Sequence, residues 1–287
     1  MVAGHRFSVR TADKALLSEE LAHYAPFAAV TDVDGSPVFT LDVVPEESLP
    51  VPERLVEEFY QDDDGSQIRL SRTPDGRSWF EFSLWGKVAG HLLASTDFTS
   101  ATLAPACYPD FALGNALMVM YALSTARLGT ALFHAAVIGY EGRGYLFLGR
   151  SGTGKSTHAR LWLRYIPGSE LVNDDNPVVR VFSDGTARVY GSPWSGKTPC
   201  YRNMDLELGA FVQLEQAPYN EIRRLRGIPA YAALVPSISG KRWDRSIADG
   251  LHETEDALAS NVPVWHLKCL PDEAAARLCK ETIASQG

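Results

Sequence analysis

The sequence predicts an α/β protein with a mixed sheet, in which a β-rich N-terminal domain precedes a domain of strands and helices. Three patterns carry this prediction. Short apolar runs separated by turn residues fill the N-terminal third, a helical pattern follows, and a glycine-rich turn at residues 149–154 then lies between a strand pattern and a helix pattern. The predicted domains are residues 1–105 and 129–287, and residues 106–128 form a connecting helix.

Composition indicates an ordinary globular protein. Of the 287 residues, 45% are apolar and 22% are charged, which suffices for a packed core. Lys and Arg number 27 against 35 Asp and Glu, and the net charge of −8 disfavours a non-specific nucleic-acid binder. No membrane span is expected, because no apolar stretch approaches about 18 residues, and no signal peptide is expected, because the N-terminus lacks an apolar h-region. Four cysteines without a C-x-x-C pair favour free thiols and a cytoplasmic protein.

The N-terminal domain is expected to consist mostly of strands. Apolar runs flanked by turn chemistry predict strands at residues 27–32, 37–44, 67–72, 78–84 and 88–95. Residues 53–61 are interpreted as a helix or loop, and the acidic run at residues 62–64 as an exposed loop rather than a metal site. We find no catalytic pattern in this domain, so we expect the function to lie in the C-terminal half.

The second half alternates strands with helices. A helical spacing of apolar residues predicts a helix at 110–127 that ends at Gly129, and a hairpin at 131–148 then leads into the glycine-rich turn. The remaining expected elements are helices at 156–165, 230–235, 246–259 and 271–283, and strands at 170–176, 178–182, 187–190, 209–214 and 264–269. Most phosphate-binding turns are instead entered from a parallel crossover helix.

Residues 149–156 satisfy the pattern G-x-x-x-x-G-K-[ST]. Glycines allow positive φ, so that successive N–H groups can point at phosphate oxygens, and the helix N-terminus adds unpaired donors. Lys155 can reach the β- and γ-phosphates of ATP, and the Ser156 hydroxyl can ligate Mg²⁺. A glycine turn that binds nothing is disfavoured by the complete match. The residues predicted to bind ATP are Ser151, Gly152, Thr153, Gly154, Lys155, Ser156 and Thr157.

Two adjacent carboxylates, Asp174 and Asp175, end a predicted strand downstream of this loop. Phosphoryl transfer needs a carboxylate near Mg²⁺ and, in kinases, another near the attacking hydroxyl. Neighbouring residues at a strand end can point in different directions, which suits these two roles, although Asp-Asp-Asn-Pro is also good turn chemistry. His134, in the strand beside the loop strand, is either a core histidine or a residue that contacts the phosphates.

Residues 191–198 satisfy the same pattern, but a proline and a tryptophan replace small residues and no amphipathic helix follows. We therefore do not expect this loop to bind the nucleotide. Its polar residues Ser195 and Lys197, with Arg202 just beyond, are predicted to bind an anion or the acceptor substrate, and an ordinary surface turn is the alternative. Three further arginines are interpreted as a phosphate clamp or a solvated face: Arg223, Arg224 and Arg226.

Taken together, these motifs resemble the HPr kinase/phosphorylase and phosphoenolpyruvate carboxykinase superfamily over about residues 130–283. The Ser-Gly-Thr-Gly-Lys segment is similar to the kinase-1a motif of carboxykinases. Residues 171–176 resemble the second kinase motif of both families, and Phe-His-Ala at residues 133–135 resembles the histidine segment of HPr kinases. The resemblance implies an HPr kinase-like P-loop domain.

Position by position, the resemblance implies that Lys155 binds phosphate and that Ser156 and Asp174 hold Mg²⁺. It implies that Asp175 is the acid/base for the acceptor hydroxyl and that His134 supports it. The expected function is transfer of the γ-phosphoryl group of ATP to a serine-like hydroxyl on a small molecule, peptide or protein. Since HPr kinases form hexamers, a homo-oligomer is a further expectation.

The chain also departs from this family. Residues 191–198 replace the acidic-Arg-Gly-x-Gly segment of genuine HPr kinases, and residues 1–105 do not resemble their N-terminal domain. Phosphoenolpyruvate carboxykinases are far longer and carry an oxaloacetate-binding lobe. Two alternatives are a carboxykinase-type enzyme and a non-catalytic ATP-sensing module. The sequence names no acceptor.

Overall fold

The chain divides into two compact units, Ala3–Thr125 together with Met1 and Ala126–Gly287 together with Val2. The structure is a computed structural model. It describes residues 1–12, 21–29, 35–45, 49, 58–61, 65–196, 198–240, 242 and 244–284. We describe each unit by itself.

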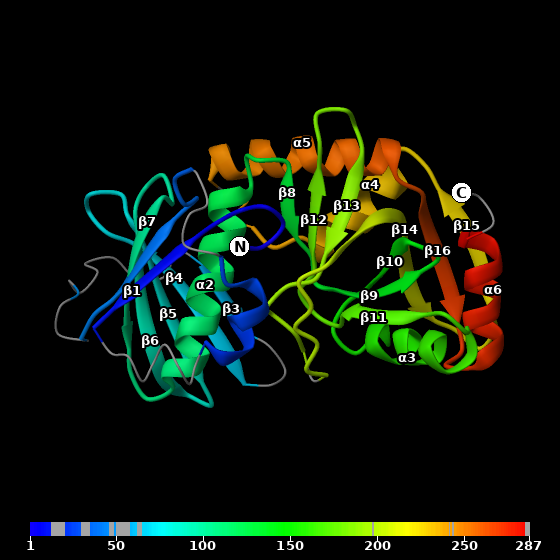
Figure 1. Ribbon diagram of the computed structural model, residues 1–287, viewed down its shortest axis with the longest axis horizontal. Coiled ribbons are helices and arrows are strands. Elements are labelled where there is room, and N and C mark those ends of the chain that lie inside the picture. The colour runs from blue at the N-terminus through cyan, green and yellow to red at the C-terminus, as the bar shows by residue number, and fades with distance from the viewer. Residues whose placement is uncertain are drawn as a thin grey trace. The chain divides into compact units, whose positions relative to one another are not determined.

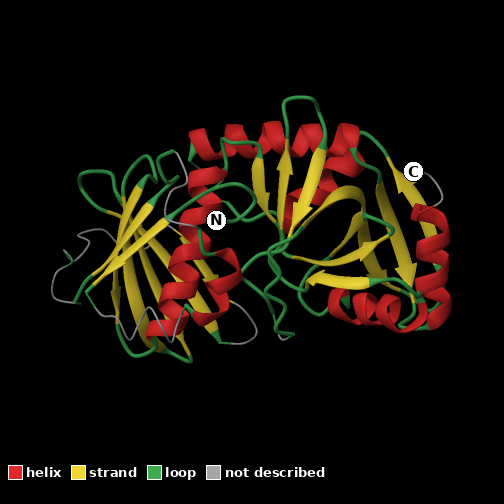
Figure 2. Cartoon of the chain, viewed as in Figure 1, coloured by secondary structure: helices red, strands yellow, loops and turns green. Residues whose placement is uncertain are grey.

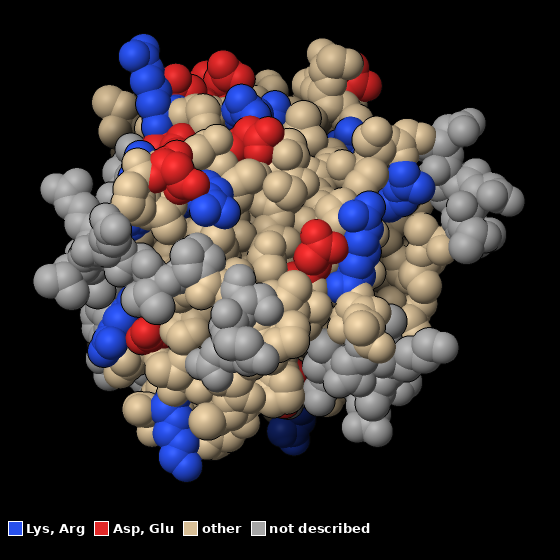
Figure 3. All heavy atoms as spheres, turned by 90° about the vertical axis from the view of Figure 1, so that its left-hand side faces the viewer, with Lys and Arg blue, Asp and Glu red and all other residues tan. Residues whose placement is uncertain are grey.

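The described part of the first unit holds a seven-stranded sheet in the order β1-β2-β7-β6-β5-β4-β3 (Figure 1). Its strands are β1 Ser8–Thr11, β2 Thr40–Val43, β3 Glu58–Gln61, β4 Ser66–Arg72, β5 Ser78–Leu84, β6 Lys87–Ala94 and β7 Ser100–Pro105. Strands β3 to β7 form an antiparallel meander, whereas β1 and β2 run parallel to β7. Helix α2, Pro109–Thr125, packs on β6 and β7. On the face drawn in Figure 3, acidic and basic side chains are interspersed.

Several sequence expectations for this unit are confirmed, and two are wrong. The predicted strands at 67–72, 78–84 and 88–95 and the helix at 110–127 correspond to β4, β5, β6 and α2. The expected strand at 27–32 is not formed at its start, because Phe27 ends a 3-10 helix, η1, at Ala22–Phe27. Residues 58–61 form strand β3 instead of a helix or loop. The acidic run at residues 62–64 lies outside the described residues.

The second unit is built on a branched mixed sheet of nine strands among its described residues. The main path is β11-β9-β10-β14-β13-β12-β8, and β16 joins β14 on one side and β15 on the other. The strands are β8 Thr130–Leu132, β9 Ala135–Tyr140, β10 Arg143–Leu148, β11 Glu170–Asn173, β12 Val178–Val181, β13 Ala187–Tyr190, β14 Asp205–Gln216, β15 Glu221–Leu225 and β16 Val264–Cys269. The sheet branches at β14 because this strand is long enough, at 12 residues, to pair with β13 near its start and with β16 near its end.

Helices cover both faces of this sheet (Figure 2). The helices are α3 Lys155–Tyr165, α4 Ile228–Leu234, η3 Val235–Ser237, α5 Arg245–Asn261 and α6 Glu273–Ile283. On one face, Trp162 of α3 and Cys279 of α6 join a fully buried core with Phe147, Val212 and Leu267. Helices α4 and α5 contact strands β16, β8 and β12. None of the described helices is long and apolar enough to cross a membrane.

Capping residues explain where two of these helices begin. The Asp244 side chain accepts a hydrogen bond from Ser246 N at the start of α5, and Asp272 accepts one from Ala275 N at the start of α6. Strand β15 was not expected from the sequence. The predicted strand at 131–140 is also interrupted, because residues 133 and 134 separate β8 from β9.

Candidate functional site

The predicted site residues gather at one edge of the sheet in the second unit. Strands β10, β14 and β16 are parallel, and β11 runs the same way because β9 is antiparallel to both β10 and β11. Their C-terminal ends therefore share an edge, where loops that follow parallel strands commonly build ligand sites. Gly149 follows β10, Asp174 and Asp175 follow β11, and Gln216 ends β14.

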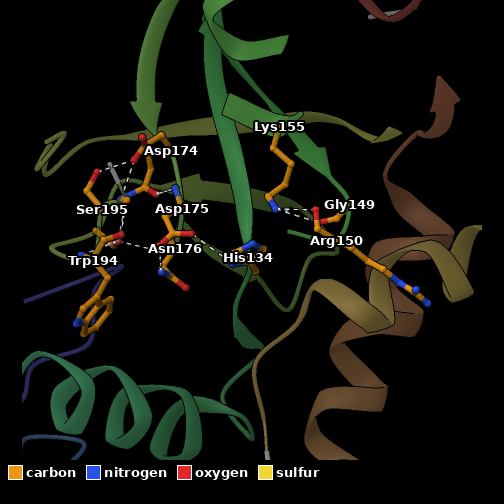
Figure 4. Close-up of polar contacts among 12 residues, drawn as sticks. His134, Gly149, Arg150, Lys155, Asp174, Asp175, Asn176, Trp194 and Ser195 are labelled. Carbon is orange, nitrogen blue, oxygen red and sulfur yellow. Dashed lines mark hydrogen bonds and ion pairs between the residues drawn. The ribbon is translucent and has the colours of Figure 1, made fainter. Parts of the chain in front are cut away.

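Residues 149–154, which we call the first glycine loop, connect β10 to α3. Three of its glycines have positive φ: +151° at Gly149, +77° at Gly152 and +109° at Gly154. Lys155, the first residue of α3, is 8% exposed and its Nζ donates hydrogen bonds to Gly149 O at 3.0 Å and to Arg150 O at 3.4 Å. The lysine is thus already folded over the loop (Figure 4). Burial lowers the pKa of Lys155, and the charge of Asp175 opposes this shift.

Gln216 supports this loop, and sequence reasoning missed it. Its Nε2 donates hydrogen bonds to Gly152 O at 3.0 Å and to Thr153 O at 3.4 Å. The Thr153 carbonyl group and the Gly154 N–H group belong to one trans peptide and point in opposite directions. Because the carbonyl group points toward Gln216, the Gly154 N–H group points away from Gln216. The available signal was the position of Gln216 at the end of a strand parallel to the one that enters the loop.

Residues 191–198 are the second glycine loop, and its described residues, 191–196 and 198, surround Asp174. The Asp174 carboxylate is 6% exposed. Its Oδ1 accepts hydrogen bonds at 2.8 Å from Ser195 Oγ and from Gly196 N, and its Oδ2 accepts one at 3.0 Å from Thr198 N. Cys200, just after this loop, is buried with its Sγ 3.4 Å from Val172 O, and burial raises its pKa. The second loop therefore fixes the first of the two carboxylates.

Asp175 faces a different group of residues (Figure 4). Its Oδ1 lies 3.3 Å from His134 Nδ1, and its Oδ2 accepts a hydrogen bond from Asn176 Nδ2 at 2.8 Å. His134 is not within a strand as expected: it lies between β8 and β9, and its backbone N–H donates to Ser237 O at 2.6 Å. Burial first, and then the charge of Lys155, lowers the pKa of His134 to about 4. His134 thus lies beside the Asp175 carboxylate, and the charge of Lys155 contributes to the low pKa of His134.

Asp174 can supply one carboxylate ligand to a magnesium ion whose other ligands include phosphate oxygens. Mg²⁺ commonly keeps several waters and binds one or two carboxylates together with substrate phosphates. Three hydrogen bonds occupy the Asp174 carboxylate, which leaves one of its four acceptor positions open, on Oδ2. Ser156 lies in the first turn of α3 beside Lys155. Among the described residues, no group of three or more His, Cys, Asp or Glu side chains could hold a metal unaided.

The residues predicted to bind substrate are not all brought together. Ser195 lies on Asp174. Arg202 instead contacts the start of β11, where its Nη1 donates to Leu171 O at 2.8 Å and its Nη2 lies 2.7 Å from Glu170 Oε2. Lys197 lies outside the described residues.

Two cavities adjoin the first glycine loop. The first has a volume of about 790 Å³ and is lined by residues 149–153, by the ends of β14 to β16 and by Pro229 of α4. The second, of about 680 Å³, is lined by residues 152–154, by the first turns of α3 and by largely apolar residues. These apolar residues are Leu161, Leu214, Ala217, Pro218, Cys269, Leu270 and Pro271.

No protein-family model matches the sequence, and no curated protein matches it. Among solved structures, the chain is similar to the HPr(Ser) kinase/phosphatase from Coxiella burnetii, with 16% sequence identity and a TM-score of 0.28. The match covers 54% of this chain and 88% of that one. A TM-score of this size does not establish a common fold.

Proposed function

We propose that this chain is an ATP-dependent kinase that transfers the γ-phosphoryl group to a hydroxyl acceptor. One observation carries the proposal: the lysine of a glycine-rich strand-to-helix loop lies over that loop, at the same edge of the sheet where the Asp175 carboxylate lies 3.3 Å from His134 Nδ1. Phosphoryl transfer depends on positioning and charge neutralisation, and these three groups supply both.

The loop supports binding of the triphosphate, and the apolar cavity beside it supports binding of the nucleobase. Backbone N–H groups of the loop and the N-terminus of α3 provide donors for phosphate oxygens, and Lys155 adds a positive charge. The cavity of about 680 Å³ includes Thr157 and the apolar residues that follow β14 and β16. Its size and lining suit a base and ribose.

In the proposed reaction, the acceptor oxygen attacks the γ-phosphorus, the bond from that phosphorus to the β,γ-bridging oxygen breaks, and ADP leaves. Asp175 takes the hydroxyl proton. His134 is neutral near pH 7, and with its proton on Nδ1 it donates to the Asp175 carboxylate and orients it. Ser156 and Asp174 would hold Mg²⁺, which when bound neutralises charge on the phosphate oxygens.

The test is phosphate transfer from γ-labelled ATP and Mg²⁺ into free serine, other small hydroxyl compounds, serine-containing peptides and HPr. Asp175→Asn should lower transfer at least about 100-fold while leaving affinity for a non-hydrolysable ATP analogue nearly unchanged. Glu170→Gln is the matched control, because Glu170 begins β11, the strand that Asp175 follows, and its carboxylate pairs with Arg202 instead of His134, so this variant should keep transfer.

Full activity in Asp175→Asn would contradict the acid/base assignment. If the chain bound the ATP analogue tightly but labelled none of these acceptors, the result would favour an ATP-sensing module over a kinase.

A further inference from the structure

A row of polar side chains crosses the sheet beside the first glycine loop. In register, Leu148, the last residue before the loop, lies opposite Gln213 of β14, Gln213 lies opposite His266 of β16, and His266 lies opposite Arg223 of β15. Because side chains alternate along strands, this row is on the face opposite Leu214 and Leu267, which pack with α3 and α6. The row forms one wall of the cavity of about 790 Å³.

Among the described residues that line this cavity, the charged side chains without an ion-pair partner are positive. Glu215 is already paired, with its Oε2 2.8 Å from His266 Nε2 and its Oε1 3.6 Å from Lys268 Nζ. Arg150 and Arg223 both line the cavity and are exposed, and within the described part of the chain neither guanidinium has a hydrogen-bond or ion-pair partner. Two unpaired guanidinium groups at one cavity favour an anion, since each can bind carboxylate or phosphate oxygens through two N–H groups.

The cavity adjoins the proposed nucleotide contacts at the first glycine loop and extends beyond them to β15 and α4. In Figure 4 the Arg150 side chain extends away from Lys155 and from the Asp175–His134 pair. The cavity shares residues 149–153 with the loop, whereas the apolar cavity that suits the nucleobase begins at residue 152 and follows α3. An anion bound at Arg223, on β15, would therefore lie beside the first glycine loop rather than within it.

We propose that this cavity binds a compound with a carboxylate or phosphate group and that Arg150 and Arg223 bind this group. The inference rests on nucleotide binding by the first glycine loop and adds a separate site for a small carboxylate or phosphate compound.

The test is calorimetric titration of the full chain after the loop has been filled with Mg²⁺ and a non-hydrolysable ATP analogue. The titrants are glycerate, which carries a carboxylate, glycerol 3-phosphate, which carries a phosphate, and uncharged glycerol. We expect one or both anions to bind and glycerol not to bind, and the comparison identifies the preferred anionic group.

Arg223→Ala should weaken anion binding about 10- to 100-fold, and Arg223→Lys should recover part of it. Arg226→Ala is the matched control, because Arg226 is exposed three residues further along and does not line the cavity. Thermal unfolding of each variant checks that it remains folded.

The inference is wrong if neither anion binds to the nucleotide-filled chain, or if Arg223→Ala and Arg226→Ala weaken binding equally. It is also wrong if the anions bind only when the ATP analogue is absent, since they would then occupy the first glycine loop. Titration of the analogue alone tests the kinase proposal separately. If the chain bound an anion through Arg223 but no nucleotide, the anion site would be supported and the kinase proposal would be contradicted.

Discussion

The two glycine loops share one sequence pattern but differ in the element that follows them and in the groups that they contact. The first, residues 149–154, leads into α3 and holds Lys155 over its own carbonyl groups. The second is residues 191–198; among the described residues that follow it no helix begins before β14, and its donors are directed at Asp174. A pattern of glycines and a lysine therefore predicts a phosphate-binding loop only when a strand enters it and a helix leaves it.

The glycines of the two loops are needed for different physical reasons. At Gly152 the space around a Cβ atom would be empty, but φ is +77°, a conformation that disfavours other residues. At Gly191 φ is outside the left-handed region, and a Cβ atom would lie 2.0 Å from Arg202 O. The first loop therefore uses glycine for its backbone conformation, and the second uses it for close packing.

The largest expected effect comes from replacing the lysine of each motif. Lys155→Ala should lower phosphate transfer about 100- to 1,000-fold, because it removes a charge directed at the phosphates. Lys197→Ala, the equivalent change in the second loop, should leave affinity for an ATP analogue within a few fold. Radiolabel transfer and analogue titration measure the two quantities. If both variants lost nucleotide affinity equally, the proposal that only the first loop binds the nucleotide would be wrong.

A smaller effect is expected from Asp174→Asn. The amide keeps the size of the side chain but replaces one accepting oxygen with a donor, so that N–H groups of the second loop face an NH₂ group. Since the position is 6% exposed, we expect a loss of about 1.5–3 kcal/mol in the free energy of unfolding, measured by urea denaturation. Asp249→Asn, on the exposed face of α5, should cost about 0.5 kcal/mol or less. Similar losses in both variants would show that the second loop does not depend on Asp174.

The smallest effect sharpens the contrast between the glycines. Gly152→Ala should cost about 1–2 kcal/mol through its positive φ and should weaken binding of the ATP analogue. In Gly196→Ala the new Cβ atom would lie 3.0 Å from Asp175 Cβ and 3.3 Å from Asp174 Oδ1, so it should disturb transfer and leave analogue affinity unchanged. Titration and transfer assays on both variants give the comparison. The distinction fails if Gly196→Ala weakens nucleotide binding as much as Gly152→Ala does.

Local patterns predicted much of the second unit. Strand β16 and helix α3 follow from apolar periodicity with clear turn and cap residues around them, and the hairpin before the first loop is confirmed as β9 and β10. Strand β15 was missed because its arginines resembled a solvated face. In the structure the Arg224 guanidinium lies over the Trp265 ring, 5.1 Å from its centroid. An apolar residue at this position would have predicted a strand, but the charged arginine did not.

The candidate site could be predicted only where its residues carry a local motif. Lys155 and the two carboxylates belong to recognisable segments. Gln216 supports the loop from 64 residues away, and the donors to Asp174 come from 21 to 24 residues further along the chain. Contacts of this kind depend on how strands pair, which a single sequence does not specify.

Chemical labelling of Cys200 can report on motion of the second glycine loop. The thiolate is the form that reacts with alkylating reagents, and burial together with a raised pKa suppresses it while the loop is closed. Cys107 is exposed and reacts without any such opening. The rate at which a maleimide modifies Cys200, relative to Cys107, therefore reports how often the loop around Asp174 moves aside, and slower labelling with Mg²⁺ and nucleotide present would show that ligands hold it closed.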